Sequence, residues 1–318
     1  MDRKGSKISI IGAGKVGANV AFTLTLAGLA SEMVLIDIDF ERAMGEAMDI
    51  IQGTPFCPTV NLYAGQYEDA AGSDIVILTA GAARKPGQSR LDLARQNVDV
   101  LRHIIAKVAR IAPDSVYIVV SNPVDIITYA AIKYSGLPQN RIIGSGTKLD
   151  SARLRTALAA HMGVNSHDVQ AFVLGEHGDT AMIPWSLTSI AGMKMETYCE
   201  FICDQHNHCG KKDLEKIISD VLTAGAEVIK RKGATFYAVS IAVRRICEAI
   251  LRDLNSVLTV SSLMHGQYGI DDVCLSLLFV IGANGIKREL PVVLAEEEKH
   301  KLRHSADTLK SLLASLGI

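Results

Sequence analysis

Apolar residues in the first half of the chain come in short continuous runs, separated by longer stretches with helical periodicity. The runs are rich in Ile and Val, which is typical of strands covered on both faces. They lie at residues 7–11, 33–36, 75–79, 116–120 and 142–143. The helical stretches lie at residues 16–29, 41–52, 91–111 and 124–134. Strands that alternate with helices predict βαβ units and a doubly wound parallel sheet of the Rossmann type.

The pattern changes after residue 146. Longer helical stretches follow, at residues 151–162, 211–231, 235–253 and 296–316. Two strand-like runs, 257–264 and 273–282, flank the turn Gly266-Gln267-Tyr268-Gly269 and predict an antiparallel pair. The 318 residues are enough for two domains. We therefore predict a Rossmann-type α/β domain over residues 1–145 and a C-terminal α+β domain over residues 146–318.

Composition indicates an ordinary globular chain. Hydrophobic residues make up 48% and charged residues 21%, and the net charge of -1 predicts no nucleic-acid or anionic-membrane partner. The longest apolar runs, such as 275–283, are too short to span a bilayer. The N-terminus has no apolar region of the kind found in signal peptides. These features favour a cytoplasmic enzyme.

The six cysteines do not form the pattern of a disulfide scaffold. Five possible metal ligands do crowd together, namely Cys199, Cys203, His206, His208 and Cys209. Their spacing matches no common zinc site, so we expect no metal centre.

A glycine-rich segment follows the first predicted strand and opens the first helix. In Gly12-Ala13-Gly14-Lys15-Val16-Gly17, the glycines permit a tight turn close to a pyrophosphate, and the helix N-terminus offers free N–H groups. Asp37 ends the second strand, where a carboxylate would accept hydrogen bonds from the adenosine ribose. The same acid would repel a 2′-phosphate. This segment therefore predicts an NAD site and favours NAD over NADP.

Polar segments follow two further strands of the predicted sheet. Residues 80–90 combine Pro86, two glycines and three cations, which is typical of a mobile anion-binding loop. The segment Ser121-Asn122-Pro123-Val124-Asp125 also begins at the carboxyl end of a strand, where open α/β sheets bind ligands.

Two segments carry candidate acid–base chemistry. His177 stands in Gly175-Glu176-His177-Gly178-Asp179, and histidine is the side chain that exchanges a proton near neutral pH. Asp150 and Arg153 begin a predicted helix, and their spacing places both side chains on one face. Asp150 could also be a simple helix cap, and Arg153 a solvated charge.

With these motifs in this order, the chain resembles the NAD-dependent L-lactate and malate dehydrogenases, most closely the bacterial L-lactate enzymes. The resemblance runs over nearly the whole length and also includes Lys232-Gly233-Ala234-Thr235. It implies that His177 exchanges a proton with the substrate 2-oxygen, with Asp150 holding the imidazole. It also implies that Arg153 clamps the substrate carboxylate and that Arg90 polarises the carbonyl. Asn122 would contact the substrate oxygen, and Thr235 would line the far end of the pocket.

The predicted site therefore has two parts. The residues expected to bind NAD are Gly12, Gly14, Lys15, Val16, Gly17, Asp37, Ala80, Gly81 and Asn122. The 2-oxo or 2-hydroxy acid would meet His177, Asp150, Arg90, Arg153, Asn122, Arg84 and Thr235. The same fold could also serve a non-catalytic NAD(H)-binding regulator.

The position that separates lactate from malate enzymes is occupied by Arg84. Lactate-specific relatives usually have Gln there, whereas malate-specific relatives usually have Arg. Glu176, Thr180, Thr235 and the segment 266–273 resemble the lactate branch more. We expect an L-lactate dehydrogenase that reduces pyruvate, with a malate or dual-specificity enzyme as the alternative.

The resemblance also bears on assembly and regulation. The family forms dimers and tetramers, so we expect a homotetramer or homodimer. Many bacterial relatives are activated by fructose 1,6-bisphosphate through an Arg and a His. Arg155 matches the first, but Gln170 replaces the second, which argues against that response. Lys148 stands where the family usually has an apolar residue.

Overall fold

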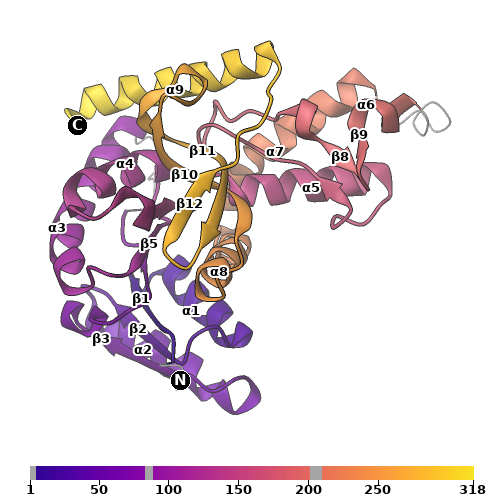
Figure 1. Cartoon of the computed structure of the whole chain (residues 1–318). Helices are drawn as coiled ribbons and strands as arrows, with labels where there is room; N and C mark the ends of the chain where they lie inside the picture. Colours follow the sequence, from indigo (N-terminus) through magenta and orange to yellow (C-terminus); the bar gives the residue numbers. More distant parts are fainter. Residues whose placement is uncertain (1–4, 83–88, 201–209) are drawn as a thin grey trace.

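The computed structural model describes residues 5–82, 89–200 and 210–318. Its centre is a nine-stranded sheet in the order β12-β11-β10-β6-β5-β4-β1-β2-β3 (Figure 1). Six strands are parallel: β1 (Lys7–Ile11), β2 (Glu32–Ile36), β3 (Asn61–Gly65), β4 (Ile75–Leu78), β5 (Val116–Val119) and β6 (Ile142–Gly144). Their order is that of a dinucleotide-binding fold, which confirms the predicted fold class.

The sheet continues beyond residue 146. The strands β10 (Ser256–His265), β11 (Asp271–Gly282) and β12 (Gly285–Glu289) form an antiparallel extension. It joins the parallel part where Ser261 pairs with Gly144. The predicted antiparallel pair is therefore confirmed, and it belongs to the same sheet as the cofactor half. The domain boundary at residue 146 stays a prediction.

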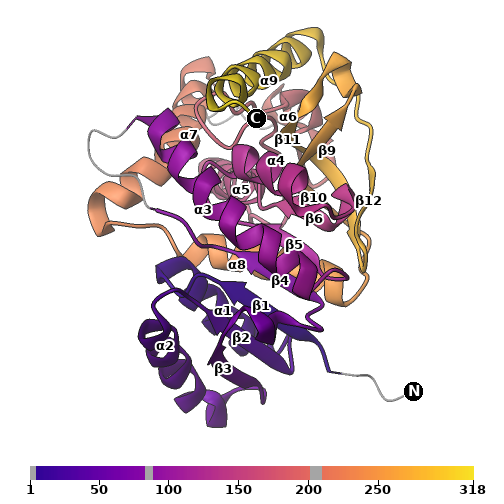
Figure 2. The same ribbon diagram turned by 90° about the vertical axis from the view of Figure 1, so that its left-hand side faces the viewer.

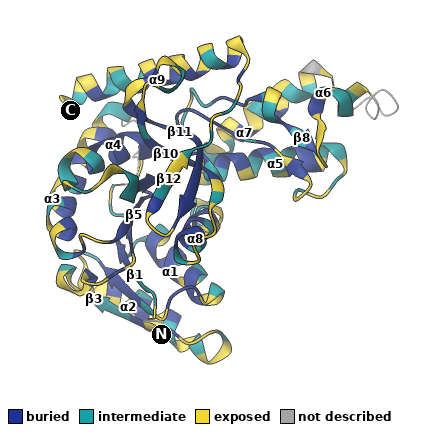
Figure 3. Ribbon diagram, viewed as in Figure 1, coloured by how far each residue is buried: buried dark blue, intermediate teal, exposed yellow. Residues whose placement is uncertain are grey.

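Helices cover the sheet on both faces. On one face α1 (Lys15–Ala27) contacts α2 (Phe40–Gln52) and α8 (Tyr237–Leu251), while on the other α3 (Arg90–Ile111) contacts α4 (Val124–Ser135). Figure 2 views the molecule from the α3 side. Helix α9 (Glu296–Leu316) crosses one end of the molecule and contacts α3 and β11. The central strands are buried between these layers, whereas the outer sides of α3 and α9 are exposed (Figure 3).

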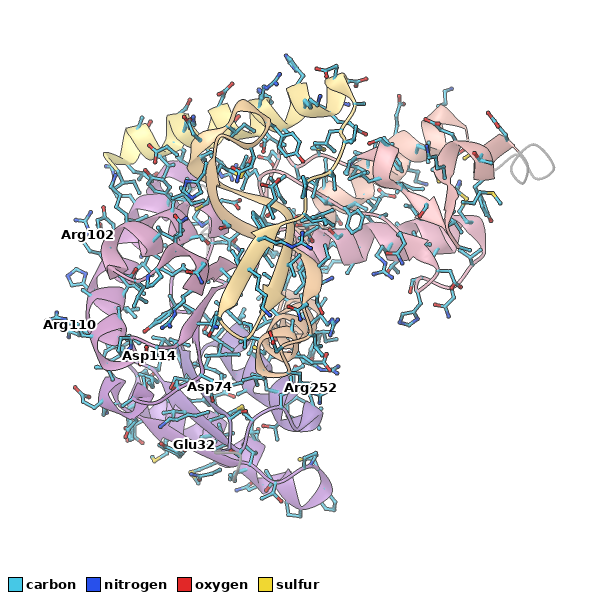
Figure 4. All side chains as sticks on the ribbon, in the orientation of Figure 1. Glu32, Asp74, Arg102, Arg110, Asp114 and Arg252 are labelled. Carbon is cyan, nitrogen blue, oxygen red and sulfur yellow. The ribbon has the colours of Figure 1, made fainter. Side chains whose placement is uncertain are left out.

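The amphipathic spacing of its residues explains which face of α3 packs against the sheet. Leu101, Ile105 and Val108 are buried against the sheet, while Arg102 and Arg110 point outward (Figure 4). Residues three and four apart share one face of a helix, so the sequence fixes which side packs.

A smaller part of the chain extends from the main body. It contains α5 (Lys148–Met162), α6 (Met195–Tyr198) and α7 (Lys211–Lys232), with short strands β7 (Val169–Gln170), β8 (Ser189–Ile190) and β9 (Met193–Lys194). It has its own apolar core, which includes Leu154, Val173 and Val221. Short 3-10 turns occupy Thr54–Phe56, Tyr67–Ala70, Gln139–Arg141, Trp185–Leu187 and Gln267–Gly269. None of the helices in the described ranges is long and apolar enough to cross a membrane.

Candidate active site

The turn between β1 and α1 has no room for side chains at two of its glycines. A Cβ on Gly17 would lie 1.8 Å from the Gly12 carbonyl oxygen, and one on Gly12 would lie 2.6 Å from the Ala80 nitrogen. Gly12 also has φ 107°, which favours glycine. By contrast, nothing lies within 4 Å of a Cβ on Gly14. The turn is therefore tightly packed at Gly12 and Gly17, whereas the space next to Gly14 is open.

The start of α1 suits an anion. No acidic residue stands in its first turn, and no side chain caps its N–H groups. Free N–H groups and the helix dipole attract a phosphate group there. Lys15 is exposed and Val16 is partly buried, both beside this turn. These residues therefore fit the pyrophosphate of a dinucleotide.

Asp37 connects the end of β2 to the same turn. Its Oδ2 accepts a hydrogen bond from the Ala13 backbone N–H at 2.6 Å, and its Oδ1 accepts one from Asp39 at 2.9 Å. Each carboxylate oxygen has a second lone pair for a ligand hydroxyl. Asp37 thus lies directly after β2 and is bound to the β1–α1 turn.

Asn97 joins the two loops that follow β4 and β5. Its Oδ1 accepts the Ala82 N–H at 2.7 Å, and its Nδ2 donates to the carbonyls of Ala82 and Asn122 at 3.1 and 2.7 Å. Ala80 is held as well, because its carbonyl accepts the Ser121 hydroxyl at 2.6 Å. The predicted residues Ala80, Gly81 and Asn122 are thereby brought to one edge of the sheet. It is the edge formed by the carboxyl ends of the parallel strands. The strand order reverses between β4 and β1, and folds of this kind bind their ligands at that point of this edge.

His177 and Asp150 form a hydrogen-bonded pair. The His177 Nδ1 lies 2.5 Å from Asp150 Oδ2, and the Arg153 Nη1 lies 2.7 Å from Asp150 Oδ1. The side chains of Asp150 and Arg153 are 10% and 19% exposed, and that of His177 is 28% exposed. One carboxylate thus binds both a histidine and an arginine, at the edge of solvent.

The charges in this cluster favour a protonated imidazole. Burial lowers the pKa of His177, but the carboxylates of Asp150 and Asp125 outweigh burial and leave that pKa above its usual value. Burial raises the pKa of Asp150, yet His177 and Arg153 outweigh it and hold that pKa below its usual value. An imidazolium beside a carboxylate is a suitable proton donor.

A glycine on α7 lies against the Arg153 guanidinium. Gly225 on α7 faces it, and a Cβ there would lie 3.7 and 3.8 Å from the two terminal nitrogens. Thr235 lies in the short segment between α7 and α8 and is partly buried. The structure therefore brings α5 and α7 together around the arginine.

Arg90 is the first residue of α3 and reaches the His177 loop. It forms an ion pair with Glu176, whose side chain is fully buried. The Thr180 hydroxyl donates to the same carboxylate. Arg90 also lies close to Gly178, where an added Cβ would be 2.8 Å from its Nη2. In this arrangement Arg90 is held next to the histidine loop.

Some predicted residues lie outside the described ranges. These are Arg84 in the anion-binding loop, and Cys203, His206, His208 and Cys209 of the cysteine and histidine cluster. Within the part of the chain that the structure describes, no group of three His, Cys, Asp or Glu side chains could hold a metal ion. Arg155 donates to the Ser166 carbonyl at 3.0 Å, and Gln170 is exposed.

Sequence reasoning missed Asn97, the role of Asp125 and the partner of Arg90. Asn97 had a detectable signal, because it occupies a buried position on the apolar face of α3, between Ala94 and Leu101. A polar residue at a core position usually has a specific hydrogen-bond partner. Glu176 and Asp125 gave no such local signal, since their partners are distant in sequence.

Comparisons with known proteins agree along the whole chain. Residues 6–144 match the NAD binding domain of lactate/malate dehydrogenase, and residues 147–316 match its alpha/beta C-terminal domain. An L-lactate dehydrogenase of Thermoanaerobacter sp. (strain X514) is 49% identical over 317 residues, which cover 98% of this chain and 100% of the relative. One from Acetivibrio thermocellus is 49% identical over 313 residues, covering 98% of each.

A comparison with a solved structure agrees with the sequence comparisons. The minor L-lactate dehydrogenase of Enterococcus mundtii superposes with a TM-score of 0.93 at 36% identity, and 98% of each chain is covered. The identity, the coverage and the two matched domains lead to one conclusion. This chain belongs to the lactate/malate dehydrogenase family.

Proposed function

We propose that this protein is an NAD-dependent L-lactate dehydrogenase, which interconverts pyruvate and L-lactate. The observation that carries the proposal is the Asp150 carboxylate, which holds both His177 and Arg153. Reduction of a 2-oxo acid needs a proton donor at the oxygen and a cation for the carboxylate, and these two residues supply them within one cluster. The L-lactate dehydrogenases at 49% identity support the same substrate.

The residues around the β1–α1 turn would hold the dinucleotide. Gly12 and Gly17 allow the tight turn and Gly14 leaves its open side free for the pyrophosphate. Lys15 and Val16 would flank the pyrophosphate, and Asp37 would accept hydrogen bonds from the adenosine ribose. Ala80, Gly81 and Asn122 would lie toward the nicotinamide. Bound NADH supplies the hydride. The acid at position 37 disfavours NADP because it would repel a 2′-phosphate.

Each residue of the cluster has a distinct role in this proposal. Arg153 binds the substrate carboxylate through two parallel hydrogen bonds, which suits a planar guanidinium. His177 gives its proton to the 2-oxygen, and Asp150 stabilises the imidazolium. Asn122 contacts the substrate oxygen, and Thr235 lines the far end of the pocket. Because the pKa of His177 is raised, reduction is favoured below that pKa and lactate oxidation above it.

Arg90 would exchange partners during the reaction. It is paired with Glu176 in this structure, and it would turn from there to the substrate carbonyl. A guanidinium at that oxygen stabilises the negative charge that develops during hydride transfer.

Arg84 supports a second candidate, malate dehydrogenase or dual specificity. A cation at the position that separates the two branches would pair with the second carboxylate of oxaloacetate. Opposite the methyl group of pyruvate, an enclosed Arg84 would lack a counter-ion, which costs about 3–5 kcal/mol if the charge is buried. An arginine that turns to solvent avoids this cost.

Steady-state kinetics with both substrates tests the proposal. We expect measurable reduction of pyruvate by NADH in the unmodified protein. We also expect that Arg84→Gln lowers kcat/KM for oxaloacetate by about tenfold more than for pyruvate, because the variant lacks the cation that would pair with the second carboxylate. A tenfold change corresponds to about 1.4 kcal/mol. Lys85→Gln removes the same charge from the same loop and is the matched control.

Two outcomes would each exclude one reading. An unchanged ratio of the two kcat/KM values in Arg84→Gln would remove the support for the second candidate, because Arg84 would then not select the substrate. Tight binding of NADH without turnover of any 2-oxo acid would favour the non-catalytic regulator instead.

We also propose a cytoplasmic homo-oligomer, either a tetramer or a dimer. Helices α1, α2 and α8 expose large apolar side chains, including Phe22, Leu26, Met44, Met48 and Ile241. Helix α1 contacts both α2 and α8, so these side chains lie on neighbouring helices, and large exposed apolar patches are typical of protein interfaces. The mass of the protein in solution, measured by light scattering, tests this proposal.

Residues 1–145 would form the NAD-binding domain and residues 146–318 the substrate domain.

A further inference from the structure

Asp125 is a buried acid directly behind the histidine loop. It lies in the first turn of α4 and is 2% exposed. Its Oδ2 accepts the backbone N–H of His177 at 2.8 Å, and its Oδ1 accepts the hydroxyl of Ser261 at 2.5 Å. Ser261 belongs to β10 and is fully buried. One carboxyl group therefore joins a helix of the cofactor half, a strand of the antiparallel extension and the loop that carries the proton donor.

A carboxyl group at this depth is costly unless both oxygens are bound. Burial raises the pKa of Asp125, while the bonds from Ser261 and His177 and the positive charges of His177 and Arg90 oppose the rise. An apolar side chain would fill the same space without this cost. A buried acid whose pKa is shifted and which binds the backbone of a proton donor is a candidate for a functional role.

The histidine loop needs anchoring because of its own sequence. Glycines stand at 175 and 178, and Gly175 has φ 86°. Three consecutive N–H groups are bound: Gly175 donates to the Ser276 carbonyl, Glu176 to the Ser305 hydroxyl, and His177 to Asp125. Of these acceptors, Asp125 belongs to the segment that also carries Asn122, three residues earlier. The Asp125 bond thus links His177 to a residue proposed to touch the substrate.

We propose that Asp125 is a positioning residue, which acts as a main-chain acceptor and fixes His177 relative to Asn122 and the substrate oxygen. With Asp150 on its imidazole, His177 is then held at two points, one on the side chain and one on the backbone. A proton donor displaced by about 1 Å loses on the order of 10²-fold in rate. This role rests on the proposed dehydrogenase function.

Two substitutions separate the hydrogen bond from the charge. Asp125→Ala removes both bonds, and we expect kcat for pyruvate reduction to fall on the order of 10²-fold. The KM for pyruvate and the Kd for NADH should change little, because Arg153 and the β1–α1 turn are untouched. In Asp125→Asn the amide oxygen still accepts the His177 N–H, and the amide nitrogen can donate to Ser261. We expect the kcat of Asp125→Asn to be about tenfold higher than that of Asp125→Ala.

Hydrogen exchange gives a readout that does not depend on activity. Labelling with ¹⁵N-histidine yields signals from nine histidines, and His177→Asn identifies the one from residue 177. We expect slow exchange of this amide in the unmodified protein and in Asp125→Asn, and fast exchange in Asp125→Ala. Glu41→Ala is the matched control, since it removes an exposed acid from the first turn of α2.

The outcomes are distinct. A kcat in Asp125→Ala close to that of the unmodified protein would overturn the proposal, as would Asp125→Asn being as impaired as Asp125→Ala. If Asp125→Ala does not fold, Ser261→Ala decides: a lower kcat with faster exchange at His177 supports the proposal, and no change in either refutes it. If the unmodified protein turns over no 2-oxo acid, the dehydrogenase function fails, while the exchange data still report whether Asp125 anchors the loop.

Discussion

The β1–α1 turn and the His177 cluster create their binding surfaces by opposite means. The turn excludes side chains, because Gly12 and Gly17 pack so tightly that a single Cβ would clash with backbone atoms. The cluster instead concentrates charged side chains, and Asp150 alone binds both His177 and Arg153. The turn therefore recognises a ligand by backbone shape, and the cluster acts on it by charge. Changes in the two regions should consequently affect different measurements.

The largest expected effect separates catalysis from cofactor binding. We expect His177→Asn to lower kcat for pyruvate reduction by about 10³-fold, because the proton donor is lost. The Kd for NADH, measured by fluorescence, should stay the same, since the β1–α1 turn is unchanged. His265→Asn removes an exposed histidine and is the control. Activity retained in His177→Asn would refute the acid–base role, and lost NADH binding would show that the two regions are not independent.

A smaller effect is expected in the turn. Gly17→Ala places a Cβ 1.8 Å from the Gly12 carbonyl and forces the turn to shift, at a cost of about 2 kcal/mol. We expect the Kd for NADH to rise by about 30-fold, which corresponds to that free energy. Gly45→Ala is the matched control, because nothing lies within 4 Å of a Cβ there. Equal NADH affinity in the two variants would contradict recognition by backbone shape.

The smallest effect concerns Lys148, a cation two residues before Asp150 that lies near two arginines. Lys148 begins α5, and burial, together with Arg155 and Arg245, lowers its pKa to about 8. A cation is also unfavourable at a helix N-terminus. We expect Lys148→Met to raise the free energy of unfolding at pH 7 by about 1 to 2 kcal/mol, allowing for partial exposure.

The pH dependence of this gain follows from the lowered pKa. Below pH 8 the amine is charged in both the folded and the unfolded state, so the folded state bears the full cost. As the pH rises from about 8 toward 10.5, the folded amine loses its proton first and the cost disappears. Denaturant unfolding at pH 7 and pH 10 measures this, with the exposed Lys216→Met as control. A gain that does not shrink with pH would show that the charge of Lys148 is not its cause.

Most of the sheet could be predicted because its central strands are buried on both faces. The runs that form β4 and β5 contain only apolar and aromatic residues, and β1 is apolar at three of its five positions. The strands β3 and β12 were missed because they lie at the two edges of the sheet and mix exposed with buried residues. Edge strands are specified by the neighbour they pair with more than by their own sequence.

The site divides in the same way. The glycine turn and Asp37 follow from local rules, because a strand, a turn and a helix impose their own spacing. The pairing of His177 with Asp150 was implied by resemblance alone, since 27 residues separate them. Asp125 approaches the His177 backbone across 52 residues and Ser261 across 136, and no local pattern specifies such contacts.

The junction at Gly144 limits how the chain could be recombined. A side chain there would collide with Thr128 on α4 and Ser261 on β10, at 2.4 and 2.7 Å, so the two halves interlock at one glycine. Ser261 also carries the bond to Asp125. A chimera that took its cofactor half from another relative and was cut near residue 146 would therefore have to keep Thr128, Gly144 and Ser261 compatible as a set. An attempt to change the coenzyme preference by grafting a different cofactor half is thus constrained by the contacts at Gly144, which are separate from the residues proposed to bind the coenzyme.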